Sequence, residues 1–153
     1  MSGIQIKDLS FAYEAGGKLI LKDINTEIGE GEFVCILGQS GCGKSTLLRL
    51  LAGLETATTG EILSDDVAIG EPSLNKGVVF QDYGLFPWMS AGENILLANR
   101  ILVLGQSPSH IIYDVKITEE LHQTRDTLFE NIDMMKLRIT LINQINKDVT
   151  THI

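Results

Sequence analysis

Apolar residues in the first part of the chain fall into short runs separated by glycines, a pattern typical of strands joined by turns. The runs open at Ile4, continue through residues 19–21 and 24–28, and reach residues 33–37, with breaks such as Gly29 between them. This succession predicts an antiparallel β-layer that leads into a strand at residues 33–37.

Helix signals and further strands follow this layer. Residues 46–52 are rich in helix formers and are followed by Gly53, so they predict a helix that ends there. Residues 60–63 and 77–80 predict two more strands, and Ser90, with an acidic residue three positions later, predicts the start of another helix.

The last third of the chain predicts a helical stretch over residues 118–146. Apolar residues recur there at steps of three and four, as on one side of a helix. They are Leu121, Leu128, Ile132, Met135, Ile139 and Ile142. Such a stripe favours core packing, and self-association is the alternative.

Composition narrows the function classes. The 153 residues carry a net charge of −8 and no basic cluster, so nucleic-acid binding is not indicated. The two cysteines, Cys35 and Cys42, indicate neither a disulfide framework nor a metal site, and a reduced cytosolic setting is expected. No signal peptide is indicated, and the apolar run at residues 95–104 is too short to span a bilayer.

The most informative stretch is a glycine-rich loop between a predicted strand and a predicted helix. It reads G-x-x-x-x-G-K-[ST] with one further Thr, and its residues are Gly38, Gln39, Ser40, Gly41, Cys42, Gly43, Lys44, Ser45 and Thr46. Both flanks match the context that a phosphate-binding P-loop requires. They disfavour the alternative of a glycine turn that binds nothing.

The residue types of this loop suit a polyphosphate. Gly38, Gly41 and Gly43 permit backbone angles that let the N–H groups point at an anion. The following helix directs its positive N-terminal end at the same place. Lys44 is expected to reach the β- and γ-phosphates, and Ser45 to offer its hydroxyl to Mg²⁺.

Two aromatic features stay open on the residues alone. Tyr13 is either an ordinary strand aromatic, which the pattern favours, or a ring stacked on adenine. Residues 84–89 are apolar and aromatic, yet their Gly and Pro predict a loop. That loop is either a core plug or a docking patch anchored by Phe86 and Trp88.

In these residues the chain resembles the ATP-binding subunit of an ABC transporter, most closely the nitrate, sulfonate and taurine import group. The resemblance places Tyr13 at the adenine-stacking A-loop, residues 38–46 at Walker A and Gln81 at the Q-loop. It implies an α/β P-loop core that binds ATP, with Mg²⁺ held by Ser45 and Gln81. It covers residues 1–98 continuously and includes Leu85-Phe86-Pro87-Trp88, which raises the docking interpretation.

The resemblance is interrupted after residue 98. The sequence contains no LSGGQ signature, Walker B, D-loop or H-loop. Residues 111–114 look like half of a Walker B motif, but Val115 stands where the family has its catalytic Glu. No catalytic residue is therefore identified beyond Gln81 as a sensor of the γ-phosphate.

The remaining residues resemble the end of the family's domain. Residues 99–104 look like the strand that follows the H-loop, and residues 107–112 like the hairpin after it. We therefore predict one ABC-type domain in two parts, residues 1–98 and 99–153. In this interpretation a mixed sheet carries an N-terminal antiparallel layer, the helical subdomain is missing, and the C-terminus is helical.

The resemblance implies an ATP-binding, energy-coupling subunit of an importer for nitrate-, sulfonate- or taurine-like solutes. It implies a cytoplasmic subunit, peripheral on the inner face of the membrane, with permease subunits and an ABC-type dimer as partners. The alternative is a non-catalytic nucleotide-binding fragment, or a remnant of a damaged gene without ATPase activity. A GTPase is disfavoured because residues 146–149 lack the last position of N-K-x-D, and a small-molecule kinase leaves residues 81–95 without explanation.

Overall fold

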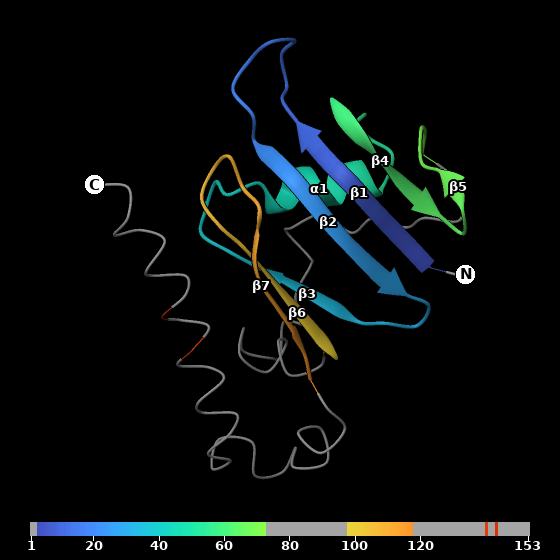
Figure 1. Ribbon diagram of the computed structural model, residues 1–153, viewed down its shortest axis with the longest axis vertical. Helices are drawn as coiled ribbons and strands as arrows, with labels where there is room; N and C mark the ends of the chain where they lie inside the picture. The colour runs from blue at the N-terminus through green and yellow to red at the C-terminus, as the bar shows by residue number, and fades with distance from the viewer. Residues whose placement is uncertain (1–2, 73–97, 118–139, 141–142, 144–153) are drawn as a thin grey trace.

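The computed structural model describes residues 3–72, 98–117, 140 and 143. Seven strands and one helix are assigned within them (Figure 1). In chain order they are β1 (Gly3–Phe11), β2 (Leu21–Gly29), β3 (Val34–Leu37), α1 (Lys44–Leu51), β4 (Thr59–Ser64), β5 (Val67–Ala68), β6 (Arg100–Leu104) and β7 (Ile111–Lys116). The elements predicted at residues 77–80, at Ser90 and throughout nearly all of 118–146 lie outside the described residues.

The first sheet is antiparallel and confirms the predicted N-terminal layer. Its strand order is β2-β1-β4-β5, with Ile6 opposite Thr26 on one side and Ile62 on the other. The pairing shifts register near Asp8, whose φ of 47° lies in the left-handed region. Asn25 stabilises this irregularity, because its side-chain oxygen accepts a hydrogen bond from the Asp8 N–H at 2.9 Å.

The second sheet is mixed and contains the strand that leads into the glycine loop. β3 pairs in parallel with β6, so that Val34 lies opposite Arg100 and Leu37 opposite Val103. β6 then pairs with β7 in the hairpin predicted from residues 107–112. The sequence left the hydrogen-bonding partner of residues 33–37 undecided, and the structure assigns β6 to that place.

The main core lies between α1 and the antiparallel sheet. Figure 1 shows α1 across one face of β1 and β2. Its residues Leu47 and Leu50 are almost fully buried, and they join Ile6, Leu9 and Leu21 in one apolar cluster. The helix begins two residues before the predicted start and ends one residue before the predicted end, with Ala52 as its C-cap and Gly53 in the left-handed region. Burial of this apolar surface is the main interaction that holds α1 against the antiparallel sheet.

Arg100 connects the two sheets through a nearly buried guanidinium. Its Nη2 donates to Asp114 Oδ2 at 2.6 Å and to Thr26 Oγ1 at 3.0 Å, and its Nε donates to Asp114 Oδ1 at 2.8 Å. Its Nη1 donates to Glu32 Oε2 at 3.2 Å and to the Glu27 carbonyl oxygen. A planar guanidinium with five donors suits such a set of acceptors. It joins β6, β7, β2 and the β2–β3 turn at one point.

The charge of this cluster makes its contribution depend on pH. The hydrogen bonds from Arg100, opposed by partial burial, hold the pKa of Asp114 below its ordinary value. A carboxyl group with a lowered folded pKa stabilises the fold above its unfolded pKa. That stabilisation is lost as the pH falls through the ordinary value near 4 toward the lower folded pKa.

We expect Asp114→Asn to lower the free energy of unfolding at pH 7 by about 1–2 kcal/mol, because charge-assisted hydrogen bonds are lost at a partly exposed carboxylate. The difference from wild type should shrink below about pH 4. Urea unfolding at pH 7 and pH 3.5 measures both values. Glu61→Gln is the control, since the Lys7–Glu61 pair is half exposed at 3.8 Å and should contribute less than about 0.5 kcal/mol. An equal loss at both pH values would contradict the assignment.

Candidate nucleotide-binding site

The backbone of the glycine loop takes the angles predicted for it. Gly38, Gly41 and Gly43 have φ values of 155°, 80° and 99°. A Cβ on Gly38 would lie 2.5 Å from the sulfur of Cys42 and 2.9 Å from the carbonyl oxygen of Leu104. A side chain is therefore excluded at the point where the loop leaves β3.

Helix α1 begins directly at the end of this loop. Gly43 is the N-cap in a left-handed conformation, and no side chain caps the helix there. The first turn carries no acidic residue. The initial N–H groups of a helix have no partners within the helix, and its dipole places partial positive charge there. The loop and the helix start thus form a backbone cradle for an anion.

Lys44 is held over the loop by two main-chain oxygens. Its Nζ donates to the carbonyl of Gly38 at 2.8 Å and to that of Gln39 at 2.6 Å, and it lies 3.6 Å from the sulfur of Cys42. An ammonium group has three donors and no acceptor, so it suits both a carbonyl pair and a phosphate. The positive charge of the Lys44 ammonium therefore lies directly against the backbone of the glycine loop.

The two cysteines are packing residues. Cys42 is 2% exposed and belongs to the apolar cluster beneath α1. This burial favours a residue that fills space in the core over a reactive thiol. Cys35 lies half-buried in β3, and burial raises the pKa of its thiol above the ordinary value. A raised pKa keeps that thiol protonated and poorly nucleophilic at neutral pH.

Tyr13 lies beside the start of α1. The residue is 60% exposed, and its ring packs edge-on against Phe11, with 4.9 Å between the ring centroids. Its hydroxyl lies 3.1 Å from Oγ1 of Thr46, a buried residue of the first helical turn. An exposed ring tethered next to the glycine loop offers a flat apolar face near any bound anion.

The remaining candidate residues divide into two groups. Ser40, Gly41 and Ser45 are exposed at the loop and the helix start, so the Ser45 hydroxyl is accessible from solvent. Gln81, Phe86 and Trp88 lie outside the described residues, as does the surrounding stretch of 73–97.

The protein oxygens at this site suit Mg²⁺ only if a bound phosphate supplies further oxygen ligands. No group of three His, Cys, Asp or Glu that could hold a metal ion occurs in the part of the chain that the structure describes. Mg²⁺ is commonly bound through one or two protein oxygens together with phosphate oxygens and water. Ser45 can supply one such oxygen at the mouth of the cradle.

One contact to the loop was not predicted from the sequence. The side-chain Nε2 of Gln106 donates to Oε1 of Gln39 at 3.1 Å. Gln106 follows β6 and is far from the loop in sequence, so only the pairing of β6 with β3 brings the two side chains together. No sequence signal marked this residue beyond its position after a predicted strand.

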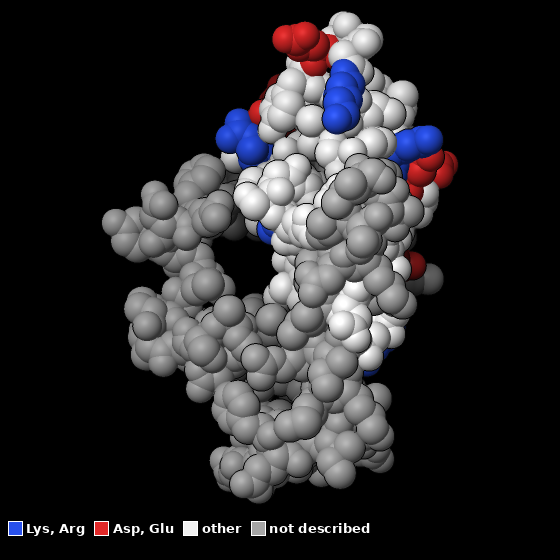
Figure 2. Space-filling view, turned by 90° about the vertical axis from the view of Figure 1, so that its left-hand side faces the viewer, with Lys and Arg blue, Asp and Glu red and all other residues white. Residues whose placement is uncertain are grey.

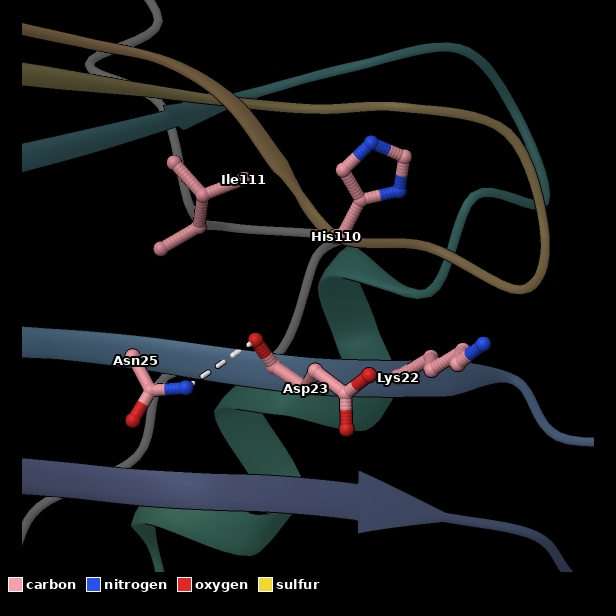
Figure 3. Close-up of a pocket in the computed structure, with 5 residues that line it drawn as sticks. All are labelled: Lys22, Asp23, Asn25, His110 and Ile111. Atoms are coloured by element: carbon pink, nitrogen blue, oxygen red, sulfur yellow. Dashed lines mark hydrogen bonds between the residues drawn. The ribbon is translucent and has the colours of Figure 1, made fainter.

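A hollow of about 350 Å³ opens beside the start of β7, away from the glycine loop (Figure 3). It is lined by Lys22, Asp23, Asn25, His110 and Ile111. Figure 3 shows the side chains of Lys22 and His110 pointing in different directions, so these two groups do not converge on one ligand position. The glycine loop is the better candidate site, because it combines a lysine ammonium with a helix N-terminus.

Charged side chains of the described residues are scattered on the face of the molecule that carries them in Figure 2. On the face shown in Figure 2, the basic side chains of the described residues stand apart and alternate with acidic ones. Among those residues, no helix is long and apolar enough to cross a membrane.

Comparison with known proteins places this site in a family. The family model described as ABC transporter matches residues 21–149. The nitrate import ATP-binding protein NrtD of Synechococcus elongatus is 36% identical over 144 residues, covering 90% of this chain and 52% of that protein. The aliphatic sulfonates import ATP-binding protein SsuB of Bacillus cereus is 43% identical over 94 residues, covering 60% of this chain and 38% of that protein.

The chain thus spans about half, or less, of the length of these curated relatives. Among solved structures, the dimeric bacterial ABC transporter cassette MJ0796 is 35% identical, with a TM-score of 0.45 over 61% of this chain and 45% of that one. The extent of the family match, together with the relative aligned over 90% of the chain, shows that the chain belongs to the ABC transporter family.

Proposed function

We propose that the chain binds ATP with Mg²⁺ and serves as the ATP-binding subunit of an ABC importer. The observation that carries the proposal is the position of the Lys44 ammonium, 2.8 Å and 2.6 Å from two carbonyl oxygens of a glycine loop that opens onto a helix N-terminus. The positive charge, the N–H groups of the glycine loop and the helix N-terminus all belong to the same nine residues. A triphosphate is the ligand that uses all of them.

Each residue of the site has a role in this proposal. Lys44 contacts the β- and γ-phosphates, and the N–H groups of the loop surround the β-phosphate. Ser45 offers an oxygen to Mg²⁺, with Gln81 as the second protein ligand and sensor of the γ-phosphate. Tyr13 stacks on the adenine, with its exposed ring as the supporting observation.

The names of the relatives support a class of transported solute. Relatives are named as import ATP-binding proteins for nitrate, aliphatic sulfonates and taurine. We infer that this chain works with permease subunits of an importer for such small anionic or zwitterionic solutes, on the inner face of the membrane. Phe86 and Trp88 are the proposed docking anchors, because clustered aromatics are typical of interface centres.

Catalysis is a separate question from binding. Hydrolysis requires a residue that orients the attacking water and further groups that stabilise the developing charge. The 153 residues contain neither a Walker B Glu nor an LSGGQ signature, so two copies of this chain form an incomplete catalytic site. This observation favours binding without turnover as the second candidate function.

We expect the chain to bind ATP saturably in the presence of Mg²⁺, and Lys44→Ala to abolish binding, because the ammonium is the strongest positive charge at the cradle. Calorimetric titration of both proteins measures this. Lys22→Ala is the matched control, since Lys22 is an exposed lysine outside the loop. Unchanged affinity in Lys44→Ala would refute the site.

Phosphate release from the same samples separates the two candidate functions, since a rate no higher than that of Lys44→Ala indicates binding without turnover.

Tyr13 provides an independent test of the adenine position. Tyr13→Phe keeps the ring and removes the hydrogen bond to Thr46, whereas Tyr13→Ala removes the ring as well. We expect Tyr13→Ala to weaken ATP binding by about 5- to 150-fold, the range for base–aromatic stacking of ~1–3 kcal/mol. Tyr13→Phe should bind within about twofold of wild type if stacking dominates. Equal losses in both variants would assign the effect to the hydroxyl and contradict stacking.

A further inference from the structure

The connection between β6 and β7, residues 105–110, is fixed firmly to the rest of the chain. The N–H of Ser109 donates to the carbonyl of Ile20, and the carbonyl of Ser109 accepts from the N–H of Lys22, each at 2.8 Å. Ser109 is fully buried, and its hydroxyl donates to the carbonyl of Gly105 at 2.9 Å. Residues 105–110 thus occupy a defined position relative to β2.

From this position the connection reaches the glycine loop. Gln106 donates from Nε2 to Oε1 of Gln39 at 3.1 Å, and both residues are half-buried. Leu104, the residue just before this connection, also lies against the loop. A Cβ added to Gly38 would lie only 2.9 Å from the Leu104 carbonyl oxygen. Two consecutive residues of the loop, Gly38 and Gln39, therefore rest against the end of β6 and the connection that follows.

Those two loop residues are the same ones that hold the lysine. The carbonyl oxygens of Gly38 and Gln39 accept the two main-chain hydrogen bonds from Nζ of Lys44. These two carbonyl groups belong to a loop that contains Gly38, Gly41 and Gly43, and glycine gives the backbone large conformational freedom. A hydrogen bond that fixes the Gln39 side chain restricts this freedom. A preorganised site binds more tightly, because less ordering is left to occur on binding.

We propose that Gln106 is a positioning residue for the P-loop. It holds Gln39 so that the ammonium of Lys44 stays aimed at the β- and γ-phosphates. The inference rests on the proposed binding of ATP, and it adds a determinant that lies 67 residues from Gln39 along the chain. Gln106 touches no phosphate itself in this proposal and acts through Gln39 and Lys44.

We expect Gln106→Ala in the full 153-residue chain to raise the Kd for ATP by about fivefold, the worth of one hydrogen bond. The Kd for AMP should not change, because AMP lacks the phosphates that Lys44 reaches. A merely structural role for Gln106 would weaken both ligands. Ser107→Ala is the matched control, since it removes a hydrogen bond from the same connection to the carbonyl of Leu19 and none to the P-loop. It should leave both constants at wild-type values.

A double-mutant cycle tests the route of the effect. If Gln106 acts through Gln39, then Gln39→Ala should weaken ATP binding as much as Gln106→Ala, and the double variant no further. Additive losses, a loss of AMP affinity, or an unchanged ATP affinity in Gln106→Ala would overturn the inference.

Melting temperatures without nucleotide identify a variant that fails to fold, and Gln106→Leu then replaces Gln106→Ala. Wild-type chain that binds no ATP would refute the proposed function itself, whereas wild-type binding with no effect of Gln106→Ala refutes this inference alone.

Discussion

The glycine loop can hold its shape only if the strand before it is fixed, and that strand depends on one parallel ladder. β3 pairs with β6 from Val34 to Leu37, and every residue of β6 is buried. Backbone groups in such a position need partners, because an unpaired buried N–H or C=O group is costly. β6 supplies them on one side of β3, and its last residue, Leu104, packs against the first glycine of the loop. The anion cradle therefore depends on two segments that are far apart in the sequence.

Arg100 fixes the register of that ladder. It is the first residue of β6, and its guanidinium reaches acceptors on β7, on β2 and on Glu32 in the β2–β3 turn. A shift of β6 by one residue would turn this side chain to the opposite face of the sheet and separate it from all of them. The ion pairs with Asp114 and Glu32 thus specify the alignment of β6 as well as stabilising it. The same alignment places Gln106 beside Gln39.

Local features of the fold could be predicted from the sequence. The antiparallel layer, the strand before the loop and the helix closed by Gly53 follow from apolar spacing and turn residues, and the structure confirms them. The β6–β7 hairpin was predicted from the family resemblance, and the structure confirms it as well. The P-loop was predictable for the same reason, because its chemistry is contained in nine consecutive residues. Membership of the ABC family, inferred from those residues together with Tyr13 and Gln81, is also confirmed.

The contacts between distant segments could not be predicted in this way. Nothing in residues 33–37 indicates that residues 100–104 lie beside them in parallel, because parallel pairing leaves no turn signal in the sequence. The role of Arg100 was missed for the same reason, since its acceptors come from three segments distant in sequence: β7, β2 and the β2–β3 turn. Asp114 looked like part of an incomplete Walker B motif, and in the structure its carboxylate is occupied by Arg100.

In this structure β6 completes the sheet behind the P-loop. Hydrogen exchange of the nucleotide-free protein, followed by mass spectrometry on peptides that cover β3 and β6, tests it most directly. We predict that the amides of both strands exchange far more slowly than those of the exposed segment at residues 14–18, because ladder hydrogen bonds protect them. Exchange of β3 as fast as that exposed segment would contradict the account, since the strand that carries the loop would then have no stable partner.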